Sequence, residues 1–301
     1  MNKEFYLPVY KKIEKEVLQL SSAISFDDDQ IGVYSLDIAG IIIRCAVEIE
    51  SLVKEIYRKE TGDEPTGTGK CVKWLEDNWK IAEKKVYIIT PYFHFKENIE
   101  LQPFNYTNGS PEDYYAAYNA IKHDRLKNIK KASVYVMIHA LAALYILNVY
   151  SEDKKIYLGD DSHATKMLDK TNGSEIFAFE VAPCDDEIRL TSEEEIVPQN
   201  CIYKIIRKMP DYAFGVNYIN EFGEHKKFRA LIGNRNFQVA LKSRIGQLID
   251  EEKMWEELSS YTTFSSSECK NQFYIHNKVK IITSILIEQN KAAFWAELNK
   301  E

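Results

Sequence analysis

The residues best suited to chemistry lie together in the stretch 118–125, YNAIKHDR. Asn119 and His123 are four residues apart, so on a helix they share one face. Lys122 and Arg125 are three residues apart and share the neighbouring face. A histidine is the usual general acid or base at neutral pH, and cations neutralise the charge that develops on a phosphate. This grouping therefore favours RNA cleavage that needs no metal.

In such a reaction His123 helps to activate the ribose 2′-hydroxyl, and Lys122 and Arg125 stabilise the pentacoordinate phosphate. Asn119 is placed to hydrogen-bond an imidazole nitrogen or a phosphate oxygen. The residues that we predict to bind the substrate beside them are Lys127, Lys130 and Tyr118. A tyrosine ring can stack on an unpaired base, and lysines contact phosphates.

The same residues also fit a structural interpretation. The stretch can be a solvated helical turn in which Asp124 pairs with Lys127 or Asn128, and its tyrosines can pack against the preceding connector. Two further charged residues, Arg44 and Glu48, lie four apart on another expected helix. Glu48 would orient His123 or Arg125 from a facing helix, or the two would form an intrahelical salt bridge.

Helical periodicity dominates the first half of the chain. It predicts four helices, at about residues 7–24, 35–60, 71–85 and 111–150. The second has one apolar stripe, made by Ile38, Ile42, Cys45, Ile49, Leu52, Val53 and Ile56. The fourth starts at Ser110 with Pro111 in the first helical position, a common helix beginning. These elements indicate an antiparallel helical bundle over residues 1–150.

The end of the fourth helix, residues 132–149, is mostly apolar and near the lower length limit for a membrane span. The polar residues His139 and Ser133 lie within this run, and the basic residues that begin the helix lead into it without a break. A buried helix at the centre of the bundle has the same pattern. We therefore expect a core helix and no membrane contact.

After residue 150 the sequence becomes polar and rich in turn-forming residues, and strand-like runs follow. The runs expected as strands are 175–181, 202–206 and 212–218. Residues 226–242 fit a hairpin, but residues 237–257 also fit a helix, and 278–301 fit a closing helix. Residues 151–301 thus form an α+β region of unknown role, and the whole chain is mainly α with an α+β carboxyl-terminal part.

Composition limits the class of protein. The 301 residues carry a net charge of −7, which argues against a protein coated in nucleic acid while leaving room for a local basic patch. The start of the sequence lacks an apolar leader, and five scattered cysteines have no metal or redox spacing. We expect a cytoplasmic protein with reduced thiols, no metal site and no cofactor.

The sequence SPEDYYAAYNAIKHDR, followed by an apolar helix, resembles the final-helix motif of HEPN-like helical proteins. The helix IAGIIIRCAVEIESLVKEIY is similar to the second helix of that class. The resemblance covers about residues 7–150. It implies an antiparallel bundle that dimerises through the motif-bearing helices, and in many members a metal-independent ribonuclease of toxin or phage-defence systems.

The position of the arginine departs from the family pattern. Active HEPN ribonucleases place it four to six residues before the histidine, where this chain has Tyr114 to Asn119. Arg125 follows His123 instead, so it takes over the phosphate contact or the catalytic function is absent. The sequence therefore predicts a ribonuclease or RNA-binding protein, with a non-catalytic interaction or dimerisation module as the alternative. The partners expected are RNA, a second copy bound through the helix carrying His123, or another protein.

Overall fold

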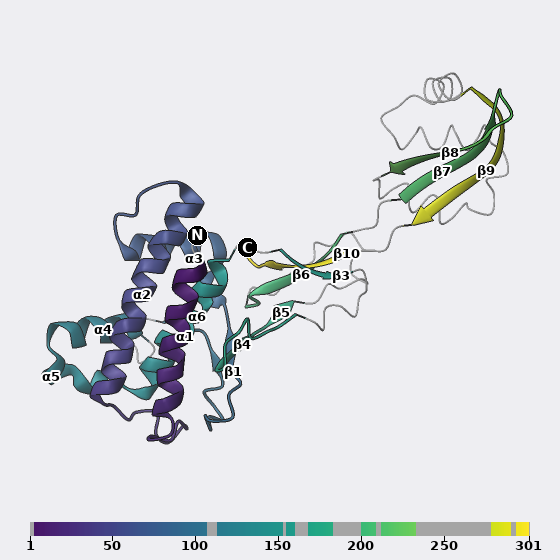
Figure 1. The fold of residues 1–301 in the computed structure, drawn as a ribbon. Coiled ribbons are helices and arrows are strands. Elements are labelled where there is room, and N and C mark those ends of the chain that lie inside the picture. The colour runs from purple at the N-terminus through teal and green to yellow at the C-terminus, as the bar shows by residue number, and fades with distance from the viewer. Residues whose placement is uncertain are drawn as a thin grey trace. The chain divides into compact units, whose positions relative to one another are not determined.

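The computed structural model describes residues 3–106, 113–152, 155–159, 168–182, 200–208, 212–232, 278–289 and 293–300. The chain divides into two compact units, the first formed by residues 1–157, 165–206 and 295–301 and the second by residues 158–164 and 207–294. Helices and small sheets make a mixed α+β protein (Figure 1). The expected boundary near residue 150 falls inside the first unit, because strands from later in the chain contribute to it.

The first unit contains the helices of the described chain. They are α1 (Lys3–Leu20), α2 (Leu36–Thr61), α3 (Thr68–Trp79), α4 (Tyr114–His123), α5 (Arg125–Asn128) and α6 (Val134–Tyr150), with 3-10 turns η1 (Ile81–Glu83) and η2 (Ile129–Lys131). Helix α2 contacts α1, α3, α4 and α6, and is therefore the element around which the others pack. None of the helices in the described ranges has both the length and the hydropathy of a transmembrane span.

The ends and the buried face of α2 follow from its sequence. The Ser35 hydroxyl accepts the Ile38 N–H at 3.1 Å and caps the first turn. Gly62 adopts φ 77°, a left-handed conformation that favours glycine, and its N–H bonds the Arg58 carbonyl at 2.9 Å. Every residue of the predicted apolar stripe is buried. The prediction for this helix is confirmed.

Helix α6 is apolar all round, and every one of its residues except Tyr135 is buried. This pattern is that of a helix at the centre of a core. His139 is only 4% exposed, and its Nδ1 lies 3.0 Å from the Tyr135 carbonyl oxygen. The prediction of a core helix over residues 132–149 is confirmed.

The expected single helix over residues 111–150 is wrong, because the chain breaks at Asp124 and again before Val134. Asp124 is extended (φ −149°, ψ 89°), and its carboxylate accepts the Lys127 N–H at 3.1 Å, which starts α5. Asn128 donates its side-chain amide to the Ala120 and Asp124 carbonyls at 3.0 and 2.9 Å. Short polar side chains thus compete for the backbone groups that a continuous helix would use. The predicted start at residues 110–111 lies outside the described residues, and Asp113 caps α4.

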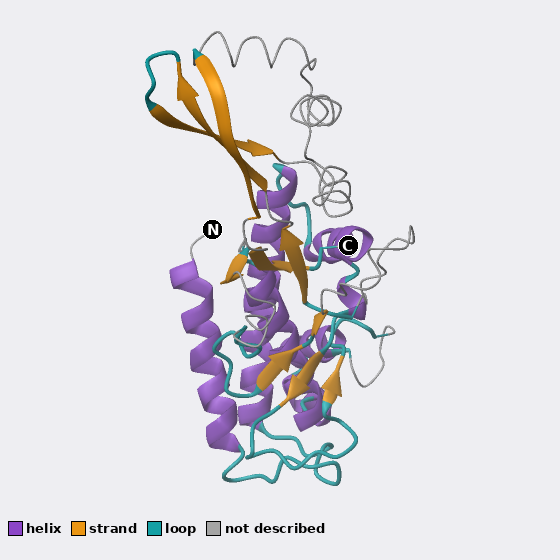
Figure 2. Cartoon of the chain, turned by 90° about the vertical axis from the view of Figure 1, so that its right-hand side faces the viewer, coloured by secondary structure: helices purple, strands orange, loops and turns teal. Residues whose placement is uncertain are grey.

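Two small sheets lie wholly or largely in the first unit. The first sheet has the strand order β2-β1-β4 and consists of β1 (Val86–Ile88), β2 (Glu100–Leu101) and β4 (Phe177–Phe179). The second has the strand order β3-β10-β6-β5 and consists of β3 (Ile156–Gly159), β5 (Val181–Ala182), β6 (Tyr203–Lys208) and β10 (Ala293–Leu298). Figures 1 and 2 show the β1 and β4 strands layered on one side of the helices. In that layer the ring of Tyr145 from α6 stacks on Phe177 of β4, with centroids 5.7 Å apart.

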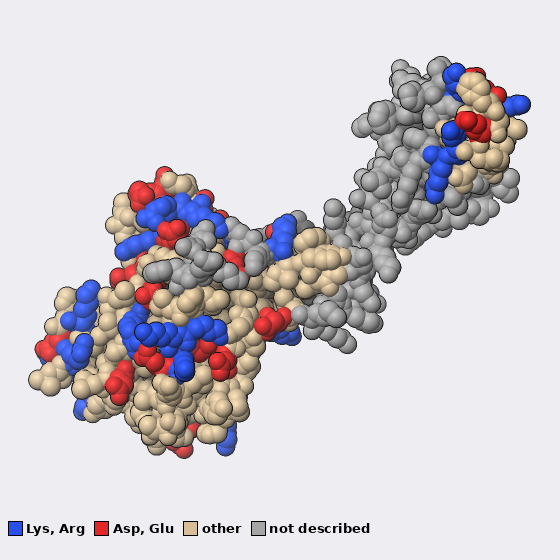
Figure 3. Space-filling view, in the orientation of Figure 1, with Lys and Arg blue, Asp and Glu red and all other residues tan. Residues whose placement is uncertain are grey.

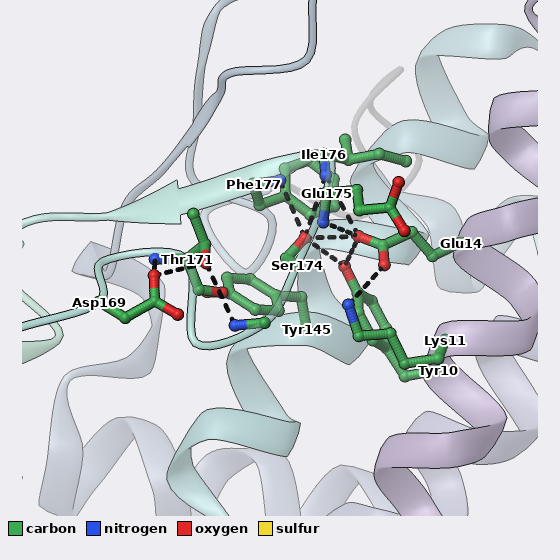
Figure 4. Close-up of polar contacts among 11 residues, drawn as sticks. Tyr10, Lys11, Glu14, Tyr145, Asp169, Thr171, Ser174, Glu175, Ile176 and Phe177 are labelled. Carbon is green, nitrogen blue, oxygen red and sulfur yellow. Dashed lines mark hydrogen bonds and ion pairs between the residues drawn. The ribbon is translucent and has the colours of Figure 1, made fainter.

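A buried polar network attaches this sheet to α1 (Figure 4). The Glu14 carboxylate, 1% exposed, accepts hydrogen bonds from the Tyr10 hydroxyl at 2.9 Å and from the Ser174 hydroxyl at 2.5 Å. The same oxygen accepts the backbone N–H groups of Glu175 and Ile176 at 2.9 and 3.2 Å. Lys11 donates to the second oxygen at 3.1 Å. We call Tyr10, Lys11, Glu14 and Ser174, with these two N–H groups, the Glu14 network.

The second unit is described as an antiparallel sheet of order β8-β7-β9, from β7 (Tyr212–Asn220), β8 (His225–Ile232) and β9 (Val279–Gln289). The helix expected over residues 278–301 is wrong, because this stretch forms β9 and β10. Its isoleucines and threonine are β-branched and favour strands, and residues 294–298 alternate buried and half-buried. Residues 226–232 belong to the β7–β8 hairpin, and residues 233–257 lie outside the described part.

Candidate nucleic-acid interface

Helix α4 carries the first half of the predicted site. The Asp113 carboxylate accepts the Ala116 N–H at 2.8 Å and begins the helix. Its buried face consists of Tyr114, Ala117, Tyr118 and Ile121. On the other side, Asn119 is half-buried and His123 is exposed, four residues apart on one face as predicted.

Lys122 and Tyr118 form a pair of their own. The Lys122 Nζ donates to the Tyr118 hydroxyl at 3.1 Å and lies 5.1 Å from the centre of the tyrosine ring. This hydrogen bond raises the pKa of Lys122. Tyr118 is 2% exposed, so its ring face is covered by protein and does not present itself for stacking on a base.

Arg125 lies beyond the break and therefore does not share a helical face with Lys122. It begins α5, where Arg125, Lys127 and the following Lys130 are all exposed. Within the described residues, no hydrogen bond or ion pair engages the side chains of His123, Arg125, Lys127 or Lys130. The alternative interpretation, a solvated turn, is right in one detail. The Asp124 carboxylate caps α5, and the Asn128 side chain donates to the carbonyls of Ala120 and Asp124.

Arg44 and Glu48 do not act as predicted. Arg44 lies across from α1 and binds both carboxylate oxygens of Glu16, with its Nη1 2.7 Å from Oε1. The Glu16 partner raises the pKa of Arg44, and Arg44 lowers the pKa of Glu16. The expected salt bridge within α2 is therefore wrong. Glu48 is half-buried, and burial raises the pKa of its carboxyl group. Among the described residues it forms no hydrogen bond or ion pair with His123 or Arg125.

The interface that remains is the stretch of residues 122–131, which we call the cationic segment. Its ten residues hold five lysines or arginines and His123 against a single carboxylate, Asp124. Eight of them are exposed, and Leu126 among them has 92% of its side-chain surface open. Figure 3 shows Lys and Arg side chains where α5 lies, and larger Lys and Arg groups with Asp and Glu among them elsewhere on the helices. The cationic segment is thus a local positive patch on a protein of net negative charge.

Sequence inspection missed the polar residues that the fold itself uses. Glu14 lies in the charged stretch KKIEKE, and its partner Ser174 follows 160 residues later, so no local pattern identifies the pair. Cys45, Cys71 and Cys201 are free and buried. In the described part of the chain, no three His, Cys, Asp or Glu side chains lie close enough to hold a metal ion.

Comparison with known proteins identifies no relative. No family model, no curated protein and no solved structure matches this chain.

Proposed function

We propose that this protein binds RNA through the cationic segment and cleaves it without a metal, with His123 as the general acid or base. The observation that carries the proposal is the exposure of His123, Arg125, Lys127 and Lys130, whose side chains have no hydrogen-bond or ion-pair partner among the described residues. Side chains that the fold does not use remain available for phosphates. Contacts from lysine and arginine to phosphates supply most of the affinity in sequence-independent nucleic-acid binding.

The roles follow from position. His123 projects from the last turn of α4, with Asn119 one turn before it to orient the imidazole or a phosphate oxygen. Arg125 and Lys127 lie on α5, so the break at Asp124 presents cations on both sides of the histidine. Lys122 is already held by the Tyr118 hydroxyl, which makes it a fixed rather than a free phosphate contact.

The resemblance to HEPN-like proteins extends this proposal. It adds an antiparallel bundle for residues 7–150, a dimer through α4 and a cytoplasmic toxin or phage-defence role. One observation favours the alternative, a non-catalytic dimerisation or protein-interaction module. Leu126 is 92% exposed in the middle of the cationic segment, and an apolar side chain so placed suits contact with another protein surface.

The binding test uses a fluorescein-labelled single-stranded RNA in EDTA, with anisotropy measured across a salt series. We expect the triple variant Arg125→Gln, Lys127→Gln, Lys130→Gln to bind about tenfold more weakly, and its log–log salt slope to be smaller by about two, at roughly 0.7 per lost phosphate contact. The control replaces three exposed lysines elsewhere, Lys12, Lys15 and Lys96, by glutamine. Equal binding and equal slopes for the two triple variants would contradict an RNA interface at this segment.

The cleavage test follows the same RNA on a denaturing gel in EDTA. Wild type should cleave it, and His123→Ala should bind the RNA equally well but leave it intact. If wild type binds RNA without cutting it, the catalytic part of the proposal is wrong and RNA binding remains. If Leu126→Glu converts a dimer to a monomer in sedimentation while wild type ignores RNA altogether, the interaction module is the correct function.

A further inference from the structure

A cavity of about 420 Å³ lies between α3, the start of α4 and residues 104–106. Its volume is in the range of small-molecule binding sites. The cationic segment and the Glu14 network are not part of its lining. It therefore raises a separate question about the chemistry of a ligand.

Aromatic rings form much of the wall, namely those of Phe104, Tyr106, Tyr114 and Tyr115. The ring of Tyr114 is nearly perpendicular to those of Phe104 and Tyr106, with interplanar angles of 82° and 74°. Aliphatic side chains fill the gaps between them, including Ile49, Val72 and Ile81. Phe104 and Tyr114 are only 7% and 2% exposed, so the ring surface open to a ligand is that of the half-buried Tyr106 and Tyr115.

The tyrosine hydroxyl groups of this wall already have partners inside the protein. Tyr115 donates to the Glu50 carboxylate at 2.9 Å, and the hydroxyls of Tyr106 and Tyr114 are hydrogen-bonded to each other. A ligand therefore meets the rings rather than free donors. Rings attract apolar groups and, through their negative faces, cations.

Charges at the mouth decide between these two kinds of ligand. Helix α3 contributes Lys73, Glu76 and Asp77 to the lining. One oxygen of Glu76 accepts the Ala82 N–H at 2.7 Å. Asp77 is exposed, and among the described residues its carboxylate has no hydrogen-bond or ion-pair partner. Two carboxylates against one ammonium leave the mouth net negative, which selects a positive ligand over a negative one.

We propose that this cavity binds a small organic ammonium ion with an apolar body. The apolar part occupies the cavity between the rings, the cationic head lies against a ring face, and Asp77 balances its charge at the mouth. Aromatic cages with a nearby carboxylate recognise quaternary ammonium groups by this combination of forces. The site is independent of the proposed RNA interface, since no residue belongs to both.

Three probes of similar size and different charge test the proposal on the full-length protein: benzyltrimethylammonium, benzyl alcohol and benzoate. Saturation-transfer NMR and calorimetric titration measure binding of each. We expect benzyltrimethylammonium to bind about tenfold more tightly than either of the others. Equal affinities, a preference for benzoate, or no binding of the ammonium probe would overturn the proposal.

Variants locate the binding. Tyr106→Leu keeps apolar volume but removes an open ring, and Asp77→Asn removes the free charge. Each should weaken binding of benzyltrimethylammonium severalfold and leave binding of benzyl alcohol unchanged. Asp63→Asn, an exposed carboxylate away from the cavity, is the control. Val72→Trp should fill the cavity and abolish binding. If circular dichroism shows these variants folded and the ammonium probe binds all of them like wild type, the cavity is not the site.

Discussion

Two groups of polar residues in this protein have opposite relations to the fold. The Glu14 network is buried, and both oxygens of its carboxylate accept hydrogen bonds. The cationic segment is exposed, and most of its charged side chains have no partner among the described residues. The first group joins α1 to the turn before β4, whereas the second contributes little to the packing of the helices.

The contrast indicates which polar residues are candidates for function. A buried carboxylate is tolerated only when hydrogen bonds replace its lost hydration, so the geometry of the Glu14 network is explained by stability alone. Five cations close together on a surface repel one another and contribute nothing comparable to folding. Their concentration is better explained by an anionic partner.

Glu14→Ala should destabilise the protein by about 3 kcal/mol, because it removes the acceptor of two hydroxyl and two backbone N–H groups. The remaining Tyr10–Ser174 and Ile176–Ser174 hydrogen bonds replace that acceptor only in part. Urea denaturation measures the loss. Glu16→Ala, two residues along the same helix, is the control and should cost about 1 kcal/mol or less, since Glu16 is partly exposed. Equal losses for both variants would show that the Glu14 network is not the anchor of the sheet.

Lys84 is a buried cation, in contrast to the exposed cations of the cationic segment. Its side chain is fully buried, and burial lowers its pKa to about 8. Between pH 8 and the unfolded value near 10.5, the unfolded chain therefore binds more protons than the folded chain. The contribution of Lys84 to stability should therefore rise with pH in that window, by about 1–2 kcal/mol from pH 8 to 10.

Lys84→Met should remove that rise, and denaturation at half-unit steps of pH between 7 and 10 measures it. Lys85→Met, at a partly exposed neighbour that pairs with Glu100, should retain it. Above pH 10 the buried tyrosines act in the other direction, because burial raises the pKa of groups such as Tyr10 and Tyr114 and stability is lost as the unfolded chain ionises. Burial also raises the pKa of Cys45 to about 12, so this thiol lowers stability between pH 8 and 10 in wild type and variant alike. Equal pH profiles for wild type and Lys84→Met would contradict the assignment to Lys84.

The Arg44–Glu16 pair lies between the two extremes, since both side chains are partly exposed yet held in a two-point contact. A double-mutant cycle with Arg44→Gln and Glu16→Gln should give a coupling free energy of about 0.5–1 kcal/mol that shrinks as salt is raised. A coupling free energy near zero at low salt would show that this pair contributes no more to stability than unpaired surface charges do.

The elements that the sequence predicted correctly are those whose evidence is local. The stripe of α2 and the apolar run of α6 each repeat over several turns, and packing preserves such periodicity. The break at Asp124 was missed because an aspartate followed by Lys127 and Asn128 is equally acceptable inside a solvated helix. Strands β9 and β10 were missed because apolar residues such as Ile281, Ile282 and Ile285 match helical and strand spacing alike, and the choice is made by pairing with β7.

The predictions for the candidate site divide in the same way, into those that rest on local sequence and those that depend on tertiary packing. The placement of Asn119 and His123 on one face of a helix followed from their four-residue spacing. The burial of Tyr118 and the partner of Arg44 did not, because each depends on which helix packs against which. Glu14 and the aromatic cavity depend on contacts between segments far apart in sequence, and nothing in composition or spacing encodes such contacts.

The smallest effects on stability should come from the cationic segment. Arg125→Gln, Lys127→Gln and Lys130→Gln, alone or together, should change the free energy of unfolding by less than about 0.5 kcal/mol, because surface substitutions without partners rarely do more. Asp124 differs from these cations, because its carboxylate has a structural role in capping α5. Asp124→Ala should speed amide hydrogen exchange in residues 125–128 while leaving global stability within about 1 kcal/mol. If the cation variants instead destabilise the protein as strongly as Glu14→Ala, the segment belongs to the fold, and its charges no longer require an anionic partner.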